Sequence, residues 1–151
     1  MTEPVEVQHK HLIVRAIVQD PPKTPEEVEL WVRQLVALIG MKLIMGPMAA
    51  RVEVPGNVGV TCVAGIETSH IALHVWEEPD PKNGREDPLM QLDVYTCGQM
   101  NHHVVFAHMR QFIPTRLEFL MLDRERAIDR IIFKEDEEHA EKIEQRKNEN
   151  E

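Results

Sequence analysis

Four β-rich segments follow one another between Met41 and Gly98, and no helical pattern separates them. The last of these segments alternates, so that Met90, Leu92 and Val94 share one face. A run of strands without intervening helices favours an antiparallel sheet over an alternating α/β fold. The expected strands cover residues 41–54 (interrupted at Gly46-Pro47), 58–66, 70–76 and 89–98.

One helix is expected before this run of strands and one after it. Thr24 and Glu27 form a T-x-x-E capping box, with Pro25 at the first helical position, and apolar residues then recur at three- and four-residue steps up to Gly40. Further segments predict a strand over 11–18, a helix over 101–112 and a strand over 115–122. The order β-α-β-β-β-β-α-β predicts an α+β, two-layer sandwich, with an antiparallel sheet and helices on one face.

Length and charge limit the domain organisation and the partners. We expect one domain over residues 1–122 and a charged C-terminal helix or disordered tail over 123–151. Residues 135–151 carry eight acidic and three basic residues, within a formal net charge of -9. Because no basic stripe is present, nucleic acid is not an expected partner. No apolar run approaches the roughly 20 residues of a membrane span, and the N-terminus lacks a signal peptide's apolar core, so we expect a cytoplasmic protein without a membrane partner.

The cysteines and histidines do not have the spacing of a metal site. Cys62 and Cys97 lie far apart and belong to no C-x-x-C motif, which also makes a structural disulfide unexpected in a cytosolic chain. The histidine pairs at residues 9 and 11 and at residues 102 and 103 have none of the usual ligand spacings, so no metal is predicted.

A cluster of polar residues interrupts the expected sheet between Gly65 and Trp76, in the sequence GIETSHIALHVW. Three interpretations compete for it. Ser69 and His70 can simply mark a strand junction, with His74 as a hydrogen-bonded core histidine. A Ser-His hydrolase is a second interpretation, but the chain lacks a G-x-S-x-G nucleophile elbow. In the third, the serine attacks its own backbone and a histidine moves protons.

Three separated blocks of sequence bear on this choice: KHLIVRA near the start, GVTCVAGIETSHIALHVW in the middle and LDVYTCG afterwards. In order and spacing, from about Lys10 to Gly98, they resemble the prokaryotic S-adenosylmethionine decarboxylase proenzyme family. The pattern of that family runs roughly G-V-S-G, then E-S-H-x-x-x-H-T-W-P-E, then D-V-[FY]-T-C-G.

The resemblance implies a self-cleaving, pyruvoyl-dependent decarboxylase. Ser69 matches the family's cleavage serine, whose hydroxyl attacks the preceding carbonyl, here that of Thr68, to form an ester. β-Elimination and hydrolysis then leave a pyruvoyl group derived from Ser69. That group would condense with the amine of S-adenosylmethionine as a Schiff base and accept electrons as carbon dioxide leaves. The product would supply spermidine synthesis, and the resemblance also implies a homodimer.

The same resemblance implies roles for further residues. His74 matches the processing histidine that removes the α-proton, and Thr61 stands where the family has the serine that assists it. Cys97 matches the catalytic cysteine that reprotonates the product carbon. Glu78 matches the acid that binds the ribose hydroxyls. Cys62 has no counterpart and is predicted to be a small core residue.

Several positions depart from the family's pattern. Thr68 replaces the glutamate before the serine, HVWEE replaces H-T-W-P-E, and Pro55 stands where the family tends to carry a purine-stacking aromatic residue. Two alternatives therefore stay open. One is a pyruvoyl-dependent decarboxylase of a smaller amino acid such as ornithine or arginine, and the other is an unprocessed, non-catalytic ligand-binding homologue.

Overall fold

The computed structural model describes residues 3–4 and 7–133, so most of the predicted charged tail lies outside the described residues. The helices are α1 (Pro25–Leu38) and α2 (His102–Met109), with short 3-10 turns at Pro81–Asn83 and Arg110–Phe112. The strands are β1 (Lys10–Val18), β2 (Leu43–Val52), β3 (Gly59–Ile66), β4 (Ser69–Trp76), β5 (Leu89–Thr96), β6 (Pro114–Asp123) and β7 (Asp129–Phe133).

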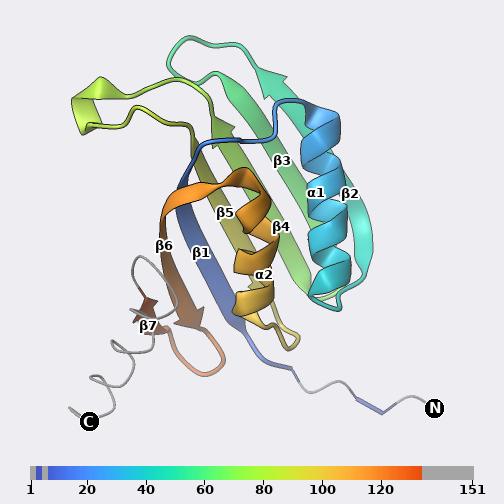
Figure 1. The fold of residues 1–151 in the computed structure, drawn as a ribbon. Helices are drawn as coiled ribbons and strands as arrows, with labels where there is room; N and C mark the ends of the chain where they lie inside the picture. The colour runs from blue at the N-terminus through green and yellow to red at the C-terminus, as the bar shows by residue number, and fades with distance from the viewer. Residues whose placement is uncertain (1–2, 5–6, 134–151) are drawn as a thin grey trace.

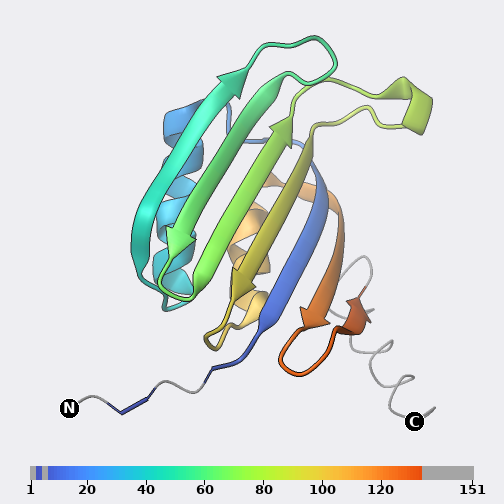
Figure 2. The ribbon, with the colours of Figure 1, turned by 180° about the vertical axis from the view of Figure 1, so that it is seen from behind.

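The described strands form one sheet in the order β2-β3-β4-β5-β1-β6-β7, and every neighbouring pair is antiparallel. Both helices pack against the same face of this sheet, α1 over β2 and β3 and α2 towards β1 and β6 (Figure 1). Seen from behind, the other face carries neither of the two described helices, and we call it the helix-free face (Figure 2). The predicted α+β fold, with helices on one face of an antiparallel sheet, is confirmed.

The core lies between the helices and the sheet, and strand alternation decides which side chains enter it. In β4, Ile71, Leu73 and Val75 are buried on the helix side. His70 and His74 are directed to the opposite face, because successive side chains of a strand point to opposite sides of the sheet. The helix-free face of the sheet is therefore where β4 carries its histidines.

Helix α1 begins as the sequence predicts and is tied to α2 at its buried face. The Thr24 hydroxyl accepts a hydrogen bond from the Glu27 N–H at 3.1 Å, and the Glu27 carboxylate accepts one from the Lys23 N–H at 2.8 Å. Trp31 Nε1 donates to the His108 carbonyl, and His108 Nε2 donates to the Trp31 carbonyl.

Among the described residues, no helix has the length and apolar character needed to cross a membrane.

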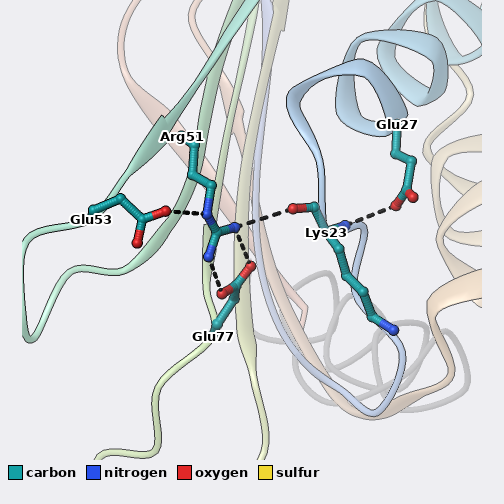
Figure 3. A network of polar contacts seen from close by, with 5 residues as sticks. All are labelled: Lys23, Glu27, Arg51, Glu53 and Glu77. Atoms are coloured by element: carbon teal, nitrogen blue, oxygen red, sulfur yellow. Dashed lines mark hydrogen bonds and ion pairs between the residues drawn. The ribbon is translucent and has the colours of Figure 1, made fainter.

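A polar network fastens the segment before α1 to the sheet (Figure 3). The Arg51 guanidinium forms a two-point contact with the Glu77 carboxylate, with both N···O distances 2.8 Å. The same guanidinium donates to Glu53 and to the Lys23 carbonyl. One side chain of β2 thus joins the end of β4 to the start of α1.

Three local features were not predicted from the sequence. β7 pairs with β6 beyond residue 122, where we expected the domain to end; that boundary stays a prediction. Phe106 of α2 is buried, although it was not predicted to be a core residue. β2 continues through the expected interruption: the Gly46-Pro47 peptide is cis, and the pairing with β3 shifts register on either side of Met45.

Candidate active site

Ser69 begins β4 directly after a two-residue connection, because Ile66 and Ser69 are paired neighbours of β3 and β4. Its φ is +145°, and among the described residues only Ile113 is another non-glycine residue with a positive φ. The backbone of a non-glycine residue in this region of φ is strained by contacts of its Cβ atom. The cost is of order 1–3 kcal/mol, and the surroundings must offset it. The strain falls on the residue that the sequence predicts to attack its own backbone.

The peptide before Ser69 is held from two directions. The Thr68 carbonyl accepts a hydrogen bond from the Cys97 N–H at 2.7 Å. The Thr68 hydroxyl accepts a hydrogen bond from the buried Thr96 hydroxyl at 2.9 Å and donates to Met41 Sδ at 3.0 Å. Both the carbonyl and the side chain of Thr68 are therefore fixed, so the rigid surroundings can maintain the strain at Ser69.

The Ser69 hydroxyl has a partner in its immediate neighbour. Its Oγ lies 3.1 Å from His70 Nδ1. The His70 ring packs against the Tyr95 ring, with centroids 5.6 Å apart, on the helix-free face of the sheet. Sequence reasoning gave His70 no role beyond a strand junction, although the adjacent letters S-H were the signal that could have pointed to it.

Thr61 and His74 form a second group. They are cross-strand neighbours in β3 and β4, and Thr61 Oγ1 lies 3.1 Å from His74 Nδ1. The His74 ring also stacks on Trp76, with centroids 5.4 Å apart. The two residues predicted to cooperate in processing are thus in direct contact, half-buried on the helix-free face rather than in the core.

The two groups do not meet within one chain. His74 lies five residues beyond Ser69 along β4, which at about 3.3 Å per residue is a separation of about 16 Å. A side chain of histidine cannot span that distance to the Ser69 α-carbon. The structure therefore brings Thr68, Ser69 and Cys97 together, and separately Thr61 and His74.

A comparison with protein families bears directly on this arrangement. A family model described as S-adenosylmethionine decarboxylase matches residues 10–125, which is most of the chain. The chain belongs to the S-adenosylmethionine decarboxylase family. The match covers β1 to β6 and both groups of candidate residues, and it shows a decarboxylase-like function.

Family members depend on a pyruvoyl group, and the surroundings of Ser69 fit the formation of one. Ser69 is the residue that would supply its atoms, the Ser69 backbone is strained, and the Thr68 carbonyl is held by a backbone donor.

The two cysteines of this family member occupy different environments. Cys62 faces the core from β3 and is 1 % exposed, as predicted; burial, with a smaller effect of Glu29, raises the pKa of its thiol to about 11. Cys97 is half-buried and follows the end of β5, directly beside the Thr68–Ser69 peptide. Of the two, Cys97 is the one placed near the candidate cleavage site.

Glu78 lies at the opposite end of β4 from Ser69, on the side of His74. Its carboxylate accepts a hydrogen bond from the Gly56 N–H at 2.7 Å, and Trp76 Nε1 donates to Asn57 at 2.7 Å in the same turn. Gly56, Trp76 and Glu78, together with Arg85, border a surface depression of about 320 Å³. A second depression, of about 430 Å³, adjoins Thr68. Glu78 is thus grouped with the Thr61–His74 pair rather than with Ser69.

Proposed function

We propose that the chain cuts itself between Thr68 and Ser69 and that Ser69 becomes the pyruvoyl group of a carboxy-lyase acting on S-adenosylmethionine. The observation that carries the proposal is the φ of +145° at Ser69, the residue that matches the family's cleavage serine. Strain at a functional position favours a reaction that releases it, and an N-to-O acyl shift frees the Thr68–Ser69 peptide from this geometry.

The Cys97 N–H supports the first step of this reaction. As the Ser69 oxygen bonds to the Thr68 carbonyl carbon, negative charge develops on the carbonyl oxygen. That oxygen already accepts the Cys97 N–H at 2.7 Å, so a fixed donor stabilises the charge without reorganisation. Collapse breaks the peptide C–N bond and leaves an ester between Thr68 and the Ser69 side chain.

His74 is proposed to act in the second step, with Thr61 fixing its ring. The imidazole removes the Ser69 α-proton, the Thr68 carboxylate leaves from the Ser69 β-carbon, and hydrolysis of the resulting end releases ammonia and forms the pyruvoyl group. Because His74 cannot reach Ser69 of its own chain, the proposal requires His74 of a second copy.

The helix-free face of the sheet supports a homodimer. A sheet face left open on one side is normally solvated and polar, or covered by a partner. Here Met45, Met48 and Val63 on that side are 66 %, 72 % and 55 % exposed. The same face carries Thr61 and His74, so a partner covering it would receive them at its own Ser69.

The pyruvoyl group supplies an electrophilic carbonyl that binds the substrate amine and accepts electrons as carbon dioxide leaves. Cys97 would then deliver a proton to the substrate carbon. The Glu78 carboxylate accepts one hydrogen bond from the Gly56 N–H, and its remaining lone pairs would accept hydrogen bonds from the ribose hydroxyls. In this proposal the product feeds spermidine synthesis.

A smaller substrate is the second candidate, and Pro55 is the observation that favours it. Pro55 offers no aromatic face for a purine, and a stacking contact of this kind is worth about 1–3 kcal/mol in nucleic-acid complexes. Carbon dioxide release measured with S-adenosylmethionine, ornithine and arginine in parallel separates these substrates.

The deciding experiment is denaturing mass spectrometry of the freshly purified chain. Wild type should appear as fragments 1–68 and 69–151, the second blocked by pyruvoyl at its new end. Ser69→Ala should stay intact, and His74→Ala should stall as an ester that hydroxylamine cleaves. Neither substitution opens a large cavity, so both variants should fold. Wild type that keeps its full-length mass through prolonged incubation would refute self-cleavage and favour the non-catalytic ligand-binding alternative.

A further inference from the structure

The first step of the proposed self-cleavage needs a base, and His74, the processing histidine taken from the family, does not supply one within the chain. A serine hydroxyl is a weak nucleophile until a neighbouring group takes its proton. His74 lies about 16 Å away along β4, at about 3.3 Å per residue. The nitrogen within hydrogen-bond distance is Nδ1 of His70, 3.1 Å from Ser69 Oγ.

The position of the His70 ring is maintained by the residues beside it in the sheet. His70, Tyr95 and His11 are lateral neighbours across β4, β5 and β1. The Tyr95 ring, against which His70 packs, is itself fixed by two contacts. The Arg124 guanidinium lies 4.3 Å from the centroid of the Tyr95 ring, and the Tyr95 hydroxyl lies 3.1 Å from His9 Nδ1. His70 therefore packs against an aromatic ring whose own position is fixed.

The charged and titratable groups around the Tyr95 ring come from three parts of the sheet. Asp93 belongs to β5 with Tyr95, His11 belongs to β1 and His9 precedes it, and Arg124 follows β6. His11 Nε2 lies 3.4 Å from Asp93 Oδ1. Burial lowers the pKa of His11 and outweighs the raising effect of Asp93, while Arg124 and His70 lower it further. The lowered pKa favours neutral His11, which reduces the positive charge facing His70.

We propose that His70 is the general base of the acyl shift, an inference that rests on the proposed self-cleavage. Its neutral ring accepts the Ser69 Oγ–H proton at Nδ1 while Oγ bonds to the Thr68 carbonyl carbon. The imidazolium then returns this proton to the Ser69 nitrogen as the Thr68–Ser69 C–N bond breaks. The products are an ester and a free amine, with no net gain or loss of protons or electrons.

This assignment divides the chemistry between two histidines. His70 acts before the ester exists and belongs to the same chain as Ser69. His74 acts after the ester has formed, on the α-proton. The two roles are separable, because hydroxylamine cleaves an ester and leaves a peptide bond intact.

The test measures ester formation in the His74→Ala background, where the reaction stops at the ester. At saturating hydroxylamine, the rate of chain cleavage reports the rate at which the ester forms. Adding His70→Ala or His70→Asn should slow it at least ~100-fold, the lower range for loss of a general base. The asparagine variant matters because its side-chain amide keeps a hydrogen-bonding group near the place of Nδ1 without the basicity. His103→Ala, on exposed α2 surface, is the matched control and should leave the rate unchanged.

Two results would overturn the assignment. Hydroxylamine cleavage of His70→Asn/His74→Ala at the rate of His74→Ala alone would mean that His70 only positions the serine. An unchanged rate in His70→Ala/His74→Ala would remove it from the reaction altogether. Circular dichroism of each variant checks folding, which is expected because His70 is exposed. If the wild-type chain never cleaves, the proposed function itself fails. If the wild-type chain cleaves and the His70 variants form the ester equally fast, only the role of His70 fails.

Discussion

Thr68 illustrates how a departure from the family's pattern is accommodated in this chain. Thr68 occupies the position where the family has glutamate. Its hydroxyl accepts a hydrogen bond from the buried Thr96 hydroxyl and donates one to Met41 Sδ. In the proposed self-cleavage the attacked group is the Thr68 backbone carbonyl, which accepts the Cys97 N–H. The substitution therefore leaves this carbonyl held by a backbone donor and changes how the side chain is anchored.

Cys97 provides the prediction at the residue scale. A proton donor for the product carbon is not required for self-cleavage, so Cys97→Ala should process normally and lose roughly 10²–10⁴-fold in decarboxylation rate. Fragment formation is followed by mass spectrometry and turnover by carbon dioxide release. Cys62→Ala is the control, because the Cys62 thiol is buried in the core and should matter only for packing. If Cys62→Ala lost turnover while Cys97→Ala kept it, the assignment would be wrong.

The sequence was sufficient to predict that Thr61 and His74 lie together, but it was not sufficient to predict the backbone conformation of Ser69. Once β3 and β4 are joined by a short connection, alternation and register bring Thr61 opposite His74, so their contact follows from the strand pattern. The positive φ of Ser69 does not follow in this way, because it depends on where the hairpin closes and on the side chains that hold Thr68.

The elements themselves were largely predictable, and the exceptions have physical causes. The capping residues predicted the start of α1, and the period-two pattern predicted the core face of β5. β7 lacked such support, because residues 129–133 form a short segment at the sheet's edge next to a highly charged tail. Edge strands have one neighbour, so their sequences are less constrained than those of central strands.

The network around Arg51 gives a prediction at the scale of elements. Hydrogen bonding to Arg51 is the main reason that the pKa of Glu77 lies below its ordinary value. A carboxylate with a lowered folded-state pKa stabilises the fold above its unfolded pKa, about 4.3, and loses that contribution as the pH falls through the folded value. Arg51→Gln should therefore lower the unfolding midpoint at pH 7, with a smaller difference from the parent chain at pH 3 and at high salt.

The measurement is thermal unfolding in the Ser69→Ala background, which keeps the chain uncut. Arg33→Gln, on the exposed side of α1, is the matched control for loss of a surface arginine. Equal differences between Arg51→Gln and the parent at pH 7 and pH 3 would show that the Glu77 contact contributes nothing measurable to joining β4 and α1.

At the scale of the whole molecule, the two described helices cover one side of the sheet and neither covers the other. The two groups of candidate residues lie about 16 Å apart along β4, at about 3.3 Å per residue. The sequence predicted a homodimer through resemblance alone; the one-sided sheet now gives a physical reason for proposing it. Each chain would be incomplete by itself, holding a strained Ser69 at one end of β4 and a Thr61–His74 pair towards the other.

A shared site predicts complementation between two inactive variants. Ser69→Ala has no nucleophile but an intact His74, whereas His74→Ala has Ser69 but lacks the processing base. In a mixed dimer, His74 of the first chain would face Ser69 of the second, so the His74→Ala chain should be cut and the Ser69→Ala chain should not. Co-expression with distinguishable tags, followed by mass spectrometry, reads out each chain, and each variant expressed alone is the control. If the co-expressed chains associate and both stay at full length, or if light scattering finds only monomers at micromolar concentration, the site is not shared between two copies.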